Sequence, residues 1–271
     1  MTIAALEEKM TATREAARPD TQSLGPVVTE KNERIAEYKR RKPRLHEKRV
    51  ASEDVAPRLT NGWVVRRKLP KGRVILEKQK APDKILENRF WCILYQFGFD
   101  ELNRGRQFQI SVTSWGKLVN KQVDVFAKIN DVVIITECKY CEKKQGISFQ
   151  ADIDDFASLQ RPIASSLRKH YGTNSKLKIV WLFVTGNVIW SEADRARAKA
   201  QNIQIIEERE LRYFEEIAKN VGPAAKYQFL GEFLSDQRIP ALSNYSVPAI
   251  RTKLGGNWAY YFWHPQIEFY Q

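Results

Sequence analysis

Apolar side chains recur along residues 84–97 at the spacing of a buried α-helix. Leu86, Phe90, Ile93 and Phe97 follow one another at steps of four and three residues, and Gly98 comes directly after them. Such steps place side chains on one face of a helix, and a glycine in this position is typical of a helix end. The pattern therefore predicts a helix that turns an apolar face toward a core.

The segments that follow have the character of β-strands. Three stretches rich in Val, Ile and Phe, separated by polar breaks, predict strands at 106–113, 122–129 and 131–139. Only Asn130 and Asp131 lie at the break between the last two, which is typical of a hairpin. A helical pattern then covers 148–171, and Pro162 is expected to kink or divide it.

Strands and helices continue to alternate in the second half of the chain. The pattern predicts a strand at 176–185, a short helix opened by Ser191 to Asp194, a strand at 203–207 and a helix at 208–220. This order predicts an α/β fold with a central mixed sheet flanked by helices. We divide the chain into a basic, partly flexible arm (1–80, helical only near 28–42), a core domain (81–220) and a helical, then irregular, C-terminal segment (221–271).

Composition limits the classes of protein that fit. The 271 residues are 43% hydrophobic, which is enough for one large or two modest domains. No apolar run approaches the roughly 18 residues of a membrane span, and the N-terminal segment lacks the apolar core of a signal peptide. Three cysteines are too few for a disulfide framework. We therefore expect a cytoplasmic protein without a membrane partner.

Positive charge is concentrated in one region. The net charge is +13, and residues 31–80 hold 17 Lys and Arg against 6 Asp and Glu, whereas the rest of the chain holds 28 against 26. Clusters at 38–49 and 63–73 suit contact with a phosphate backbone, with Arg40 and Arg41 as candidates. The alternative is a solvated, charged tail.

Three charged residues stand within the predicted hairpin strands. Glu137 and Lys139 share a strand face with Val133 and Ile135, and Asp124 on the neighbouring strand can oppose them. Two carboxylates held close together raise each other's pKa and cost stability unless a cation lies between them. Oxygen ligands favour Mg²⁺ or Mn²⁺. The alternative is an Asp124–Lys139 salt bridge at a sheet edge, with Glu137 at a fraying strand end.

Asp124, twelve intervening residues and then Glu137-Cys138-Lys139 resemble the motif of the PD-(D/E)xK nuclease superfamily, also called the restriction endonuclease-like fold. The resemblance covers roughly 81–210, where the order of elements also matches, although Val123 replaces a proline that the superfamily often varies. It implies a DNA endonuclease that hydrolyses phosphodiester bonds. Asp124, Glu137 and the backbone carbonyl of Cys138 would bind Mg²⁺, for which Mn²⁺ can substitute, and Lys139 would position the attacking water.

The resemblance also suggests residues around this centre. Glu87, an acidic residue on the first helix, would be a fourth member, although it could simply face solvent in the first helical turn. Gln160 would lie near the site, or be an ordinary helix glutamine. Double-strand cleavage usually needs two active sites, so we expect a homodimer. Candidate DNA contacts close to the site are Arg104, Arg106, Lys143 and Lys144.

A zinc site at Cys138-x-x-Cys141 is disfavoured. The sequence has no second cysteine pair, and none of His46, His170 and His264 forms a partner pair for it. The composition and motif point instead to oxygen ligands.

A narrower resemblance concerns biological context. Residues 87–110, the motif strands and residues 246–262 look like nuclease domains joined to the DGQHR domain of proteins associated with DNA phosphorothioation and phage defence, although no Asp-Gly-Gln-His-Arg stretch is present. It implies a role in restriction or antiviral defence, with a partner protein of such a system. The alternatives are a catalytically inactive nucleic-acid-binding module, an RNA-cutting enzyme and a purely structural protein.

Overall fold

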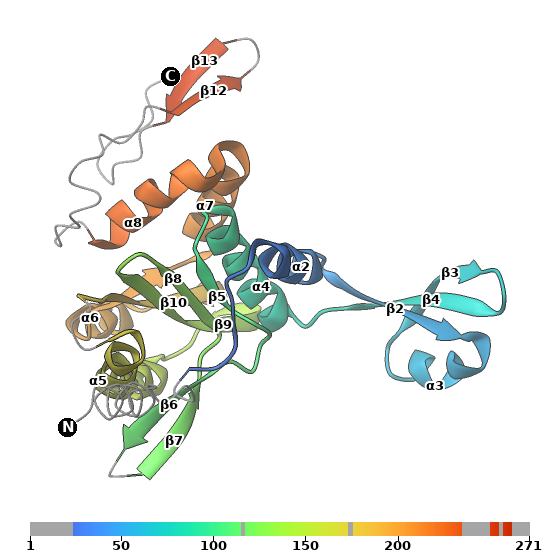
Figure 1. Cartoon of the computed structure of the whole chain (residues 1–271), viewed down its shortest axis with the longest axis horizontal. Helices are drawn as coiled ribbons and strands as arrows, with labels where there is room; N and C mark the ends of the chain where they lie inside the picture. Colours follow the sequence, from blue (N-terminus) through green and yellow to red (C-terminus); the bar gives the residue numbers. More distant parts are fainter. Residues whose placement is uncertain (1–23, 115–116, 173–175, 235–249, 255–256, 262–271) are drawn as a thin grey trace, which may run out of the picture.

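A six-stranded mixed sheet forms the centre of the computed structural model, which describes residues 24–114, 117–172, 176–234, 250–254 and 257–261 (Figure 1). Its strands, in spatial order, are β1 (Val27–Val28), β5 (Glu101–Asn103), β8 (Val125–Ile129), β9 (Val132–Gly146), β10 (Lys178–Ile189) and β11 (Ile203–Ile206). Strands β1, β5, β8 and β9 pair antiparallel, whereas β9, β10 and β11 pair parallel. The prediction of a central mixed sheet is confirmed.

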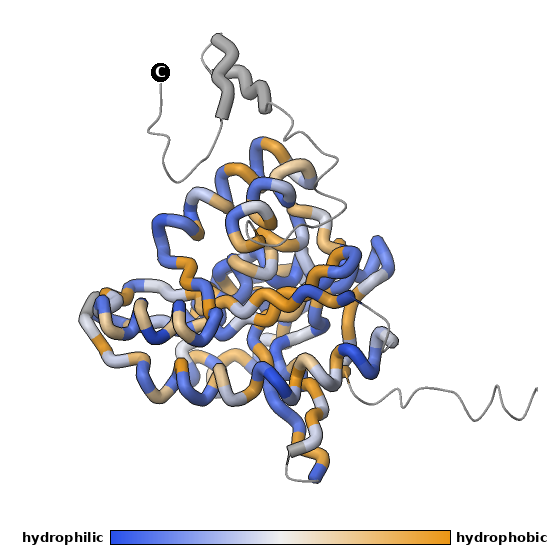
Figure 2. Tube along the Cα trace, turned by 90° about the vertical axis from the view of Figure 1, so that its left-hand side faces the viewer, coloured by the Kyte–Doolittle hydropathy of each residue, from blue (hydrophilic) through white to orange (hydrophobic). Residues whose placement is uncertain are grey.

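Helices cover both faces of this sheet (Figure 1). One face packs against α4 (Pro82–Gln96), α7 (Glu208–Val221) and α8 (Lys226–Leu234), and the other against α5 (Gln150–Tyr171) and α6 (Glu192–Ala200). Val132 and Ile134 point into the first core, and Val133 and Ile135 into the second. Figure 2 shows these apolar strands running through the middle of the molecule. In the described part, no helix is long and apolar enough to cross a membrane.

Local sequence signals explain several element boundaries. Asn130, at φ 49°, makes the tight turn between β8 and β9, a conformation that asparagine tolerates better than most residues. The Ser191 side chain accepts a hydrogen bond from the backbone N–H of Asp194 at 3.1 Å and caps α6. Helix α5 continues through Pro162, so the expected division does not occur.

The strands before the hairpin differ from the prediction. β6 (Gln109–Ser114) pairs with β7 (Lys117–Gln122), and a break precedes β8 at Val125. The predicted strand at 122–129 therefore merged the end of β7 with β8, because the apolar residues continue across the break. Residues predicted as irregular near the C-terminus include the hairpin of β12 (Ile250–Leu254) and β13 (Asn257–Tyr261); the rest of 241–271 lies outside the described residues.

Residues before position 80 are more structured than predicted. The expected helix is α2 (Lys31–Arg41), but a small three-stranded sheet follows, in the order β2 (Leu45–Ala51), β4 (Arg73–Gln79), β3 (Val64–Leu69), with the short helices η1 (Ser52–Asp54) and α3 (Ala56–Leu59). The prediction of one short helix here is wrong. This small sheet projects from the body of the molecule (Figure 1) and has a core of only Val50, Val74 and Leu76 with partly buried neighbours.

Lys80 ties the small sheet to the body. Its side chain is 5% exposed and donates hydrogen bonds to the backbone carbonyls of Arg40 and Arg41, both at 3.1 Å. Its backbone N–H also donates to the carbonyl of Arg44 at 3.0 Å. The two chain segments that lead to the small sheet are therefore held side by side at the end of α2.

Arg41 fixes α2 to the body and does not face solvent. Its side chain is 1% exposed, lies 4.8 Å from the centre of the Trp91 ring and donates to the carbonyl of Gly105 and, at 2.7 Å, to Glu37. Burial alone would raise the pKa of Glu37, but its hydrogen bonds to Arg40 and Arg41 outweigh burial and lower it to about 2. The prediction that Arg41 contacts DNA is wrong, because this buried pair holds it inside.

Arg41→Ala should lower the free energy of unfolding by about 3 to 5 kcal/mol, because it leaves the Glu37 carboxylate without its buried partner and removes the contacts of the guanidinium with Trp91 and Gly105. Arg40 also pairs with the Glu37 carboxylate, but the Arg40 side chain is 55% exposed. Arg40→Ala should therefore lower the free energy of unfolding by less than about 1 kcal/mol. Urea denaturation of both variants measures the difference. Equal losses would contradict the structural role assigned to Arg41.

Candidate functional site

The three residues of the predicted motif line one hollow. This carboxylate hollow has a volume of about 300 Å³ and lies between the end of β7, the start of β8, strand β9 and helix α5. Its lining residues are Lys121, Gln122, Asp124, Glu137, Lys139, Asp152, Asp155, Phe156 and Leu159. Two carboxylates and an amine from adjacent extended segments thus open on the same space.

The register of the hairpin explains this convergence. Phe126 lies opposite Ile135, and Val125 opposite Thr136. Asp124 directly precedes β8 and therefore follows in register opposite Glu137, on the sheet face that α5 covers. One oxygen of Asp124, Oδ2, accepts a hydrogen bond from the backbone N–H of Cys138 at 2.8 Å. The carboxyl group is held at the strand end rather than left to rotate in solvent.

The pKa values of both carboxyl groups are raised. Burial, the negative charge of Glu137 and that of Glu87 raise the pKa of Asp124 to about 7, against the lowering effect of the Cys138 hydrogen bond. The pKa of Glu137 is also raised, first by burial and then by the charges of Asp152 and Asp155, although Lys139 opposes this. The hollow therefore concentrates negative charge that is only partly compensated.

Lys139 compensates part of that charge. Its ammonium lies 3.2 Å from Glu137 Oε1 and 2.9 Å from Asp152 Oδ1. Burial alone would lower the pKa of Lys139, but the hydrogen bond and charge of Asp152, with those of Glu137, outweigh burial and raise it. Lys139 is thus a fixed cation and hydrogen-bond donor. Among the ion pairs of the described residues, Lys139 is joined to Glu137 and Asp152, not to Asp124 as the salt-bridge alternative required.

Asp152 and Asp155 are site residues that the sequence did not reveal. Both lie near the start of α5. Acidic residues are common there because the helix dipole favours them, so their presence does not by itself indicate a site. Their spacing of three places them on one side of the helix. The available signal was that the helix after the motif strand begins with acids at this spacing.

The donors present fit a hard divalent cation. Within the described ranges, no three His, Cys, Asp or Glu side chains come together as a metal-binding group. The carboxylates of Asp124 and Glu137 are two, and Mg²⁺ is commonly held by one or two protein carboxylates while keeping several waters. Their pKa values are raised by burial first and then by neighbouring carboxylates, and a bound cation would offset both effects.

Glu87 lies apart from this hollow and already has a partner. It is 6% exposed on α4, and Arg106 Nε donates to its Oε2 at 2.7 Å while a second guanidinium nitrogen contacts Oε1. Its charge still reaches Asp124, whose pKa it raises. Direct participation of Glu87 in metal binding therefore stays a prediction that requires this bidentate pair to open.

The other residues predicted to contact DNA differ in exposure and in their partners. Arg40 and Arg104 are more than half exposed but pair with Glu37 and Glu33 respectively. Lys143 is exposed on β9, and the side chain of Lys144 lies outside the described residues. Gln160 Nε2 donates to the carbonyl of Gln201 at 2.8 Å. Gln160 does not line the hollow, so this structure supports the ordinary helix glutamine.

Cys138 is held as a neutral thiol, which does not suit a zinc ligand. Cys138 is buried, and burial, followed by the charges of Asp124 and Glu87, raises its thiol pKa. Cys141 is only partly buried on the same strand and packs at the edge of the α5 core. A thiolate, which zinc requires, is therefore disfavoured at Cys138.

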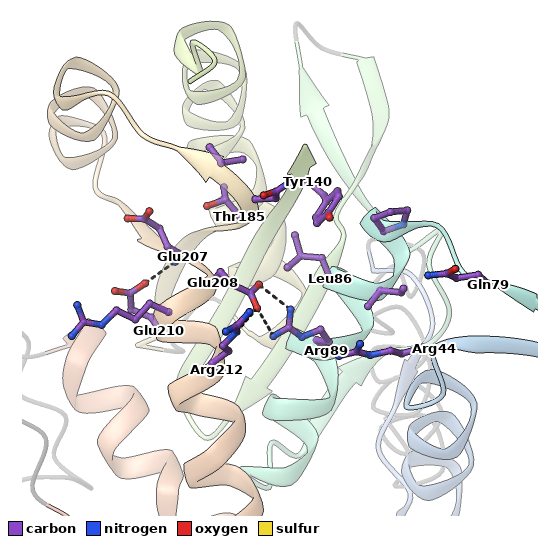
Figure 3. A pocket seen from close by; sticks show the side chains of 15 residues that line it. Arg44, Gln79, Leu86, Arg89, Tyr140, Thr185, Glu207, Glu208, Glu210 and Arg212 are labelled. Carbon is purple, nitrogen blue, oxygen red and sulfur yellow. Dashed lines mark hydrogen bonds and ion pairs between the residues drawn. The ribbon is translucent and has the colours of Figure 1, made fainter. Parts of the chain in front are cut away.

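A second, larger hollow of about 1060 Å³ lies beside β9 on the α4 face (Figure 3). Tyr140 lines it, whereas the preceding Lys139 lines the carboxylate hollow, because successive strand residues point to opposite faces. The Tyr140 ring lies against Gly186, where an added Cβ would come within 2.8 Å of Cδ2. Figure 3 shows Arg89 reaching Glu208 in this hollow, and the ion pair between them measures 2.9 Å.

Comparison with known proteins gives distant structural matches. No protein-family model matches the chain, and no curated protein does. A protein of Vibrio cholerae has a TM-score of 0.37 and 14% identity, over 80% of this chain and 50% of the other. Can2 of Sulfobacillus thermosulfidooxidans, solved with cyclic tetra-adenylate, has a TM-score of 0.37 and 14% identity, over 62% of this chain and 45% of Can2.

A repair endonuclease of Pyrococcus abyssi has a TM-score of 0.26 and 13% identity, over 54% of this chain and 65% of the other. The chain spans about half the length of the first of these structures. Such TM-scores decide neither a family nor an activity, and none of these matches links the chain to DGQHR-domain proteins. The chemistry must be argued from the residues themselves.

Asp124→Asn should stabilise the metal-free protein above neutral pH. The folded-state pKa of Asp124, about 7, lies above its ordinary value, so the wild type loses stability as pH rises from about 4 through 7, where the folded carboxyl must ionise. The asparagine is neutral at every pH. In chelator, its free energy of unfolding relative to wild type should increase by roughly 1 to 4 kcal/mol between pH 4 and pH 8. Chemical denaturation at both pH values measures this, and a pH-independent difference would contradict it.

Proposed function

We propose that the chain is a metal-dependent DNA endonuclease that hydrolyses phosphodiester bonds at the carboxylate hollow. The observation that supports this most directly is the meeting of Asp124, Glu137 and Lys139 in one hollow. It is the arrangement that the motif resemblance implies. The mixed sheet with helices on both faces is the scaffold expected with it.

Asp124 and Glu137 would hold the cation, together with the backbone carbonyl of Cys138. The ion, once bound, supplies a Lewis acid for the scissile phosphate and lowers the pKa of a bound water. The protein's part is to aim both carboxylates at the same space, where a bound cation would favour their ionised forms. The hydrogen bond from the Cys138 N–H fixes Asp124, and the neighbouring Lys139 favours the charged form of Glu137.

Lys139 acts as a donor and not as a base. Its raised pKa keeps the ammonium protonated at neutral pH, so it cannot remove a proton from water there. It can orient the attacking water and stabilise the negative charge that develops on the phosphate oxygens. In the reaction, the water oxygen bonds to phosphorus and one ester P–O bond breaks, which leaves a phosphate monoester and a free hydroxyl group.

Asp152 would position Lys139. Its oxygen lies 2.9 Å from the lysine ammonium, closer than that of Glu137 at 3.2 Å. An ammonium shared between two carboxylates keeps its direction when one of them turns to a metal ion. This division of roles lets Glu137 bind a cation without releasing Lys139 from the site.

Wild-type protein should nick supercoiled DNA and cut linear DNA in Mg²⁺ or Mn²⁺, and chelator should abolish both reactions. Lys139→Ala and Glu137→Gln should each reduce the cleavage rate by at least about 100-fold, because each removes charge stabilisation from the transition state. Lys169→Ala, which removes an exposed lysine on α5 outside the hollow, is the matched control and should cut like wild type. Agarose gel time courses measure the rates.

Two results would overturn the assignment. Full cleavage by Lys139→Ala would place the chemistry elsewhere, and DNA binding without cleavage by any form would favour the alternative of a catalytically inactive binding module. A defence role and a homodimer stay predictions that these assays do not address.

A further inference from the structure

A hollow of the small sheet collects positive charge far along the chain from the carboxylates. It has a volume of about 380 Å³, and it is lined by Lys48, Arg49, Val50, Ala51, Asp54, Arg58 and Arg73. Four of these seven residues are cationic and one is acidic. We call this the basic hollow.

Strand register brings two of its arginines to one face. Ala51 lies opposite Arg73, and Arg49 precedes Ala51 by two positions. Arg49 and Arg73 are therefore diagonal neighbours on the same face of the β2–β4 pair, about 7 to 8 Å apart by the usual spacing. Like charges in this arrangement destabilise a sheet unless an anion lies between them. Arg67 on β3 extends the row, because it lies opposite Ile75, as Arg49 does.

The cations of the basic hollow are not neutralised by the protein. Among the described ion pairs, Glu47 and Glu77 are taken by Arg66, and neither Arg49, Arg58 nor Arg73 has a carboxylate partner. The Nε atom of Arg58 is buried and has no hydrogen-bond partner within the described residues. A buried donor without an acceptor is costly, and the guanidinium of Arg58, which lines the hollow, would form hydrogen bonds with a bound anion.

The surroundings favour a long polyanion over a small free anion. Residues 45–79 carry 9 Lys and Arg against 4 Asp and Glu, and the small sheet projects from the body of the molecule (Figure 1). Guanidinium groups recognise phosphate oxygens in a bidentate manner. Released counterions add a driving force that does not depend on sequence.

We infer that the basic hollow binds a backbone phosphate of DNA, as a second contact apart from the carboxylate hollow. This inference rests on the proposed function for the identity of the polyanion. It assigns the small sheet to holding the substrate, with Arg49, Arg58 and Arg73 as the phosphate ligands and Lys48 as a supporting charge. Bond cleavage stays with the residues of β8, β9 and α5.

Binding without cleavage tests the inference. The full chain with Asp124→Asn is titrated in chelator against a fluorescent DNA duplex at several salt concentrations, and anisotropy gives the binding constant. Adding Arg49→Ala and Arg73→Ala should weaken binding by about 10-fold or more and reduce the slope of log K against log salt by about 1 to 2, since each phosphate contact contributes about 0.9. Circular dichroism melts check that the variants fold.

Two controls give the result its meaning. Lys199→Ala with Lys219→Ala removes two exposed charges near the ends of α6 and α7, and should leave the slope unchanged. Arg49→Lys with Arg73→Lys keeps the charges and should retain most of the slope. The inference would be overturned by an unchanged slope in the variant with Arg49→Ala and Arg73→Ala. It would also be overturned if the slope fell equally in the control with Lys199→Ala and Lys219→Ala.

The outcome is separate from that of the cleavage assay. If wild-type protein cuts DNA but the double alanine variant binds with an unchanged slope, the basic hollow is not a phosphate site and the proposed enzyme stands. If the slope falls as expected but no form cuts DNA, the phosphate site stands and the nuclease assignment fails.

Discussion

The alternation of side chains along β9 is the constraint on which both the core and the candidate site depend. Val133 and Ile135 are buried beneath α5, and Glu137 and Lys139 continue the same face to where the carboxylate hollow opens. A slip of one residue would turn Glu137 toward the α4 core and bring Cys138 into the hollow. The buried first half of the strand therefore sets the direction of the charged second half, and the tight turn at Asn130 delivers Asp124 opposite it.

The grouping of carboxylates in the hollow lowers the stability of this part of the fold. Asp124 and Glu137 are both partly buried, and their pKa values are raised by that burial and by the carboxylates around them. Lys139 and the backbone N–H of Cys138 offset only part of this increase. Repulsion retained at a hollow is expected where a ligand completes the site, and the compact cores on the two sheet faces keep the scaffold folded around it.

The sequence predicted what local periodicity determines. The hairpin, the face shared by Glu137 and Lys139, and the helices over both sheet faces follow from spacing that a single segment displays. Asp152 was missed because its pairing with Lys139 depends on how α5 packs. Arg41 was misread because burial by Glu37 and Trp91 comes from tertiary contacts. The strands of the small sheet were missed because their charged residues obscure the few apolar ones, Val50, Val74 and Leu76, that form its core.

Lys80 has a wider consequence than its two hydrogen bonds indicate. Its ammonium is held by the last carbonyls of α2, and Arg41 fixes α2 to α4, so a continuous series of contacts joins the root of the small sheet to α4, on the face of the central sheet opposite the carboxylate hollow. A shorter side chain at position 80 would lose both hydrogen bonds, and the small sheet would then rotate more freely about the two segments that join it to the body. Lys80 thus links the position of the small sheet to that of α4 through both its side chain and its backbone.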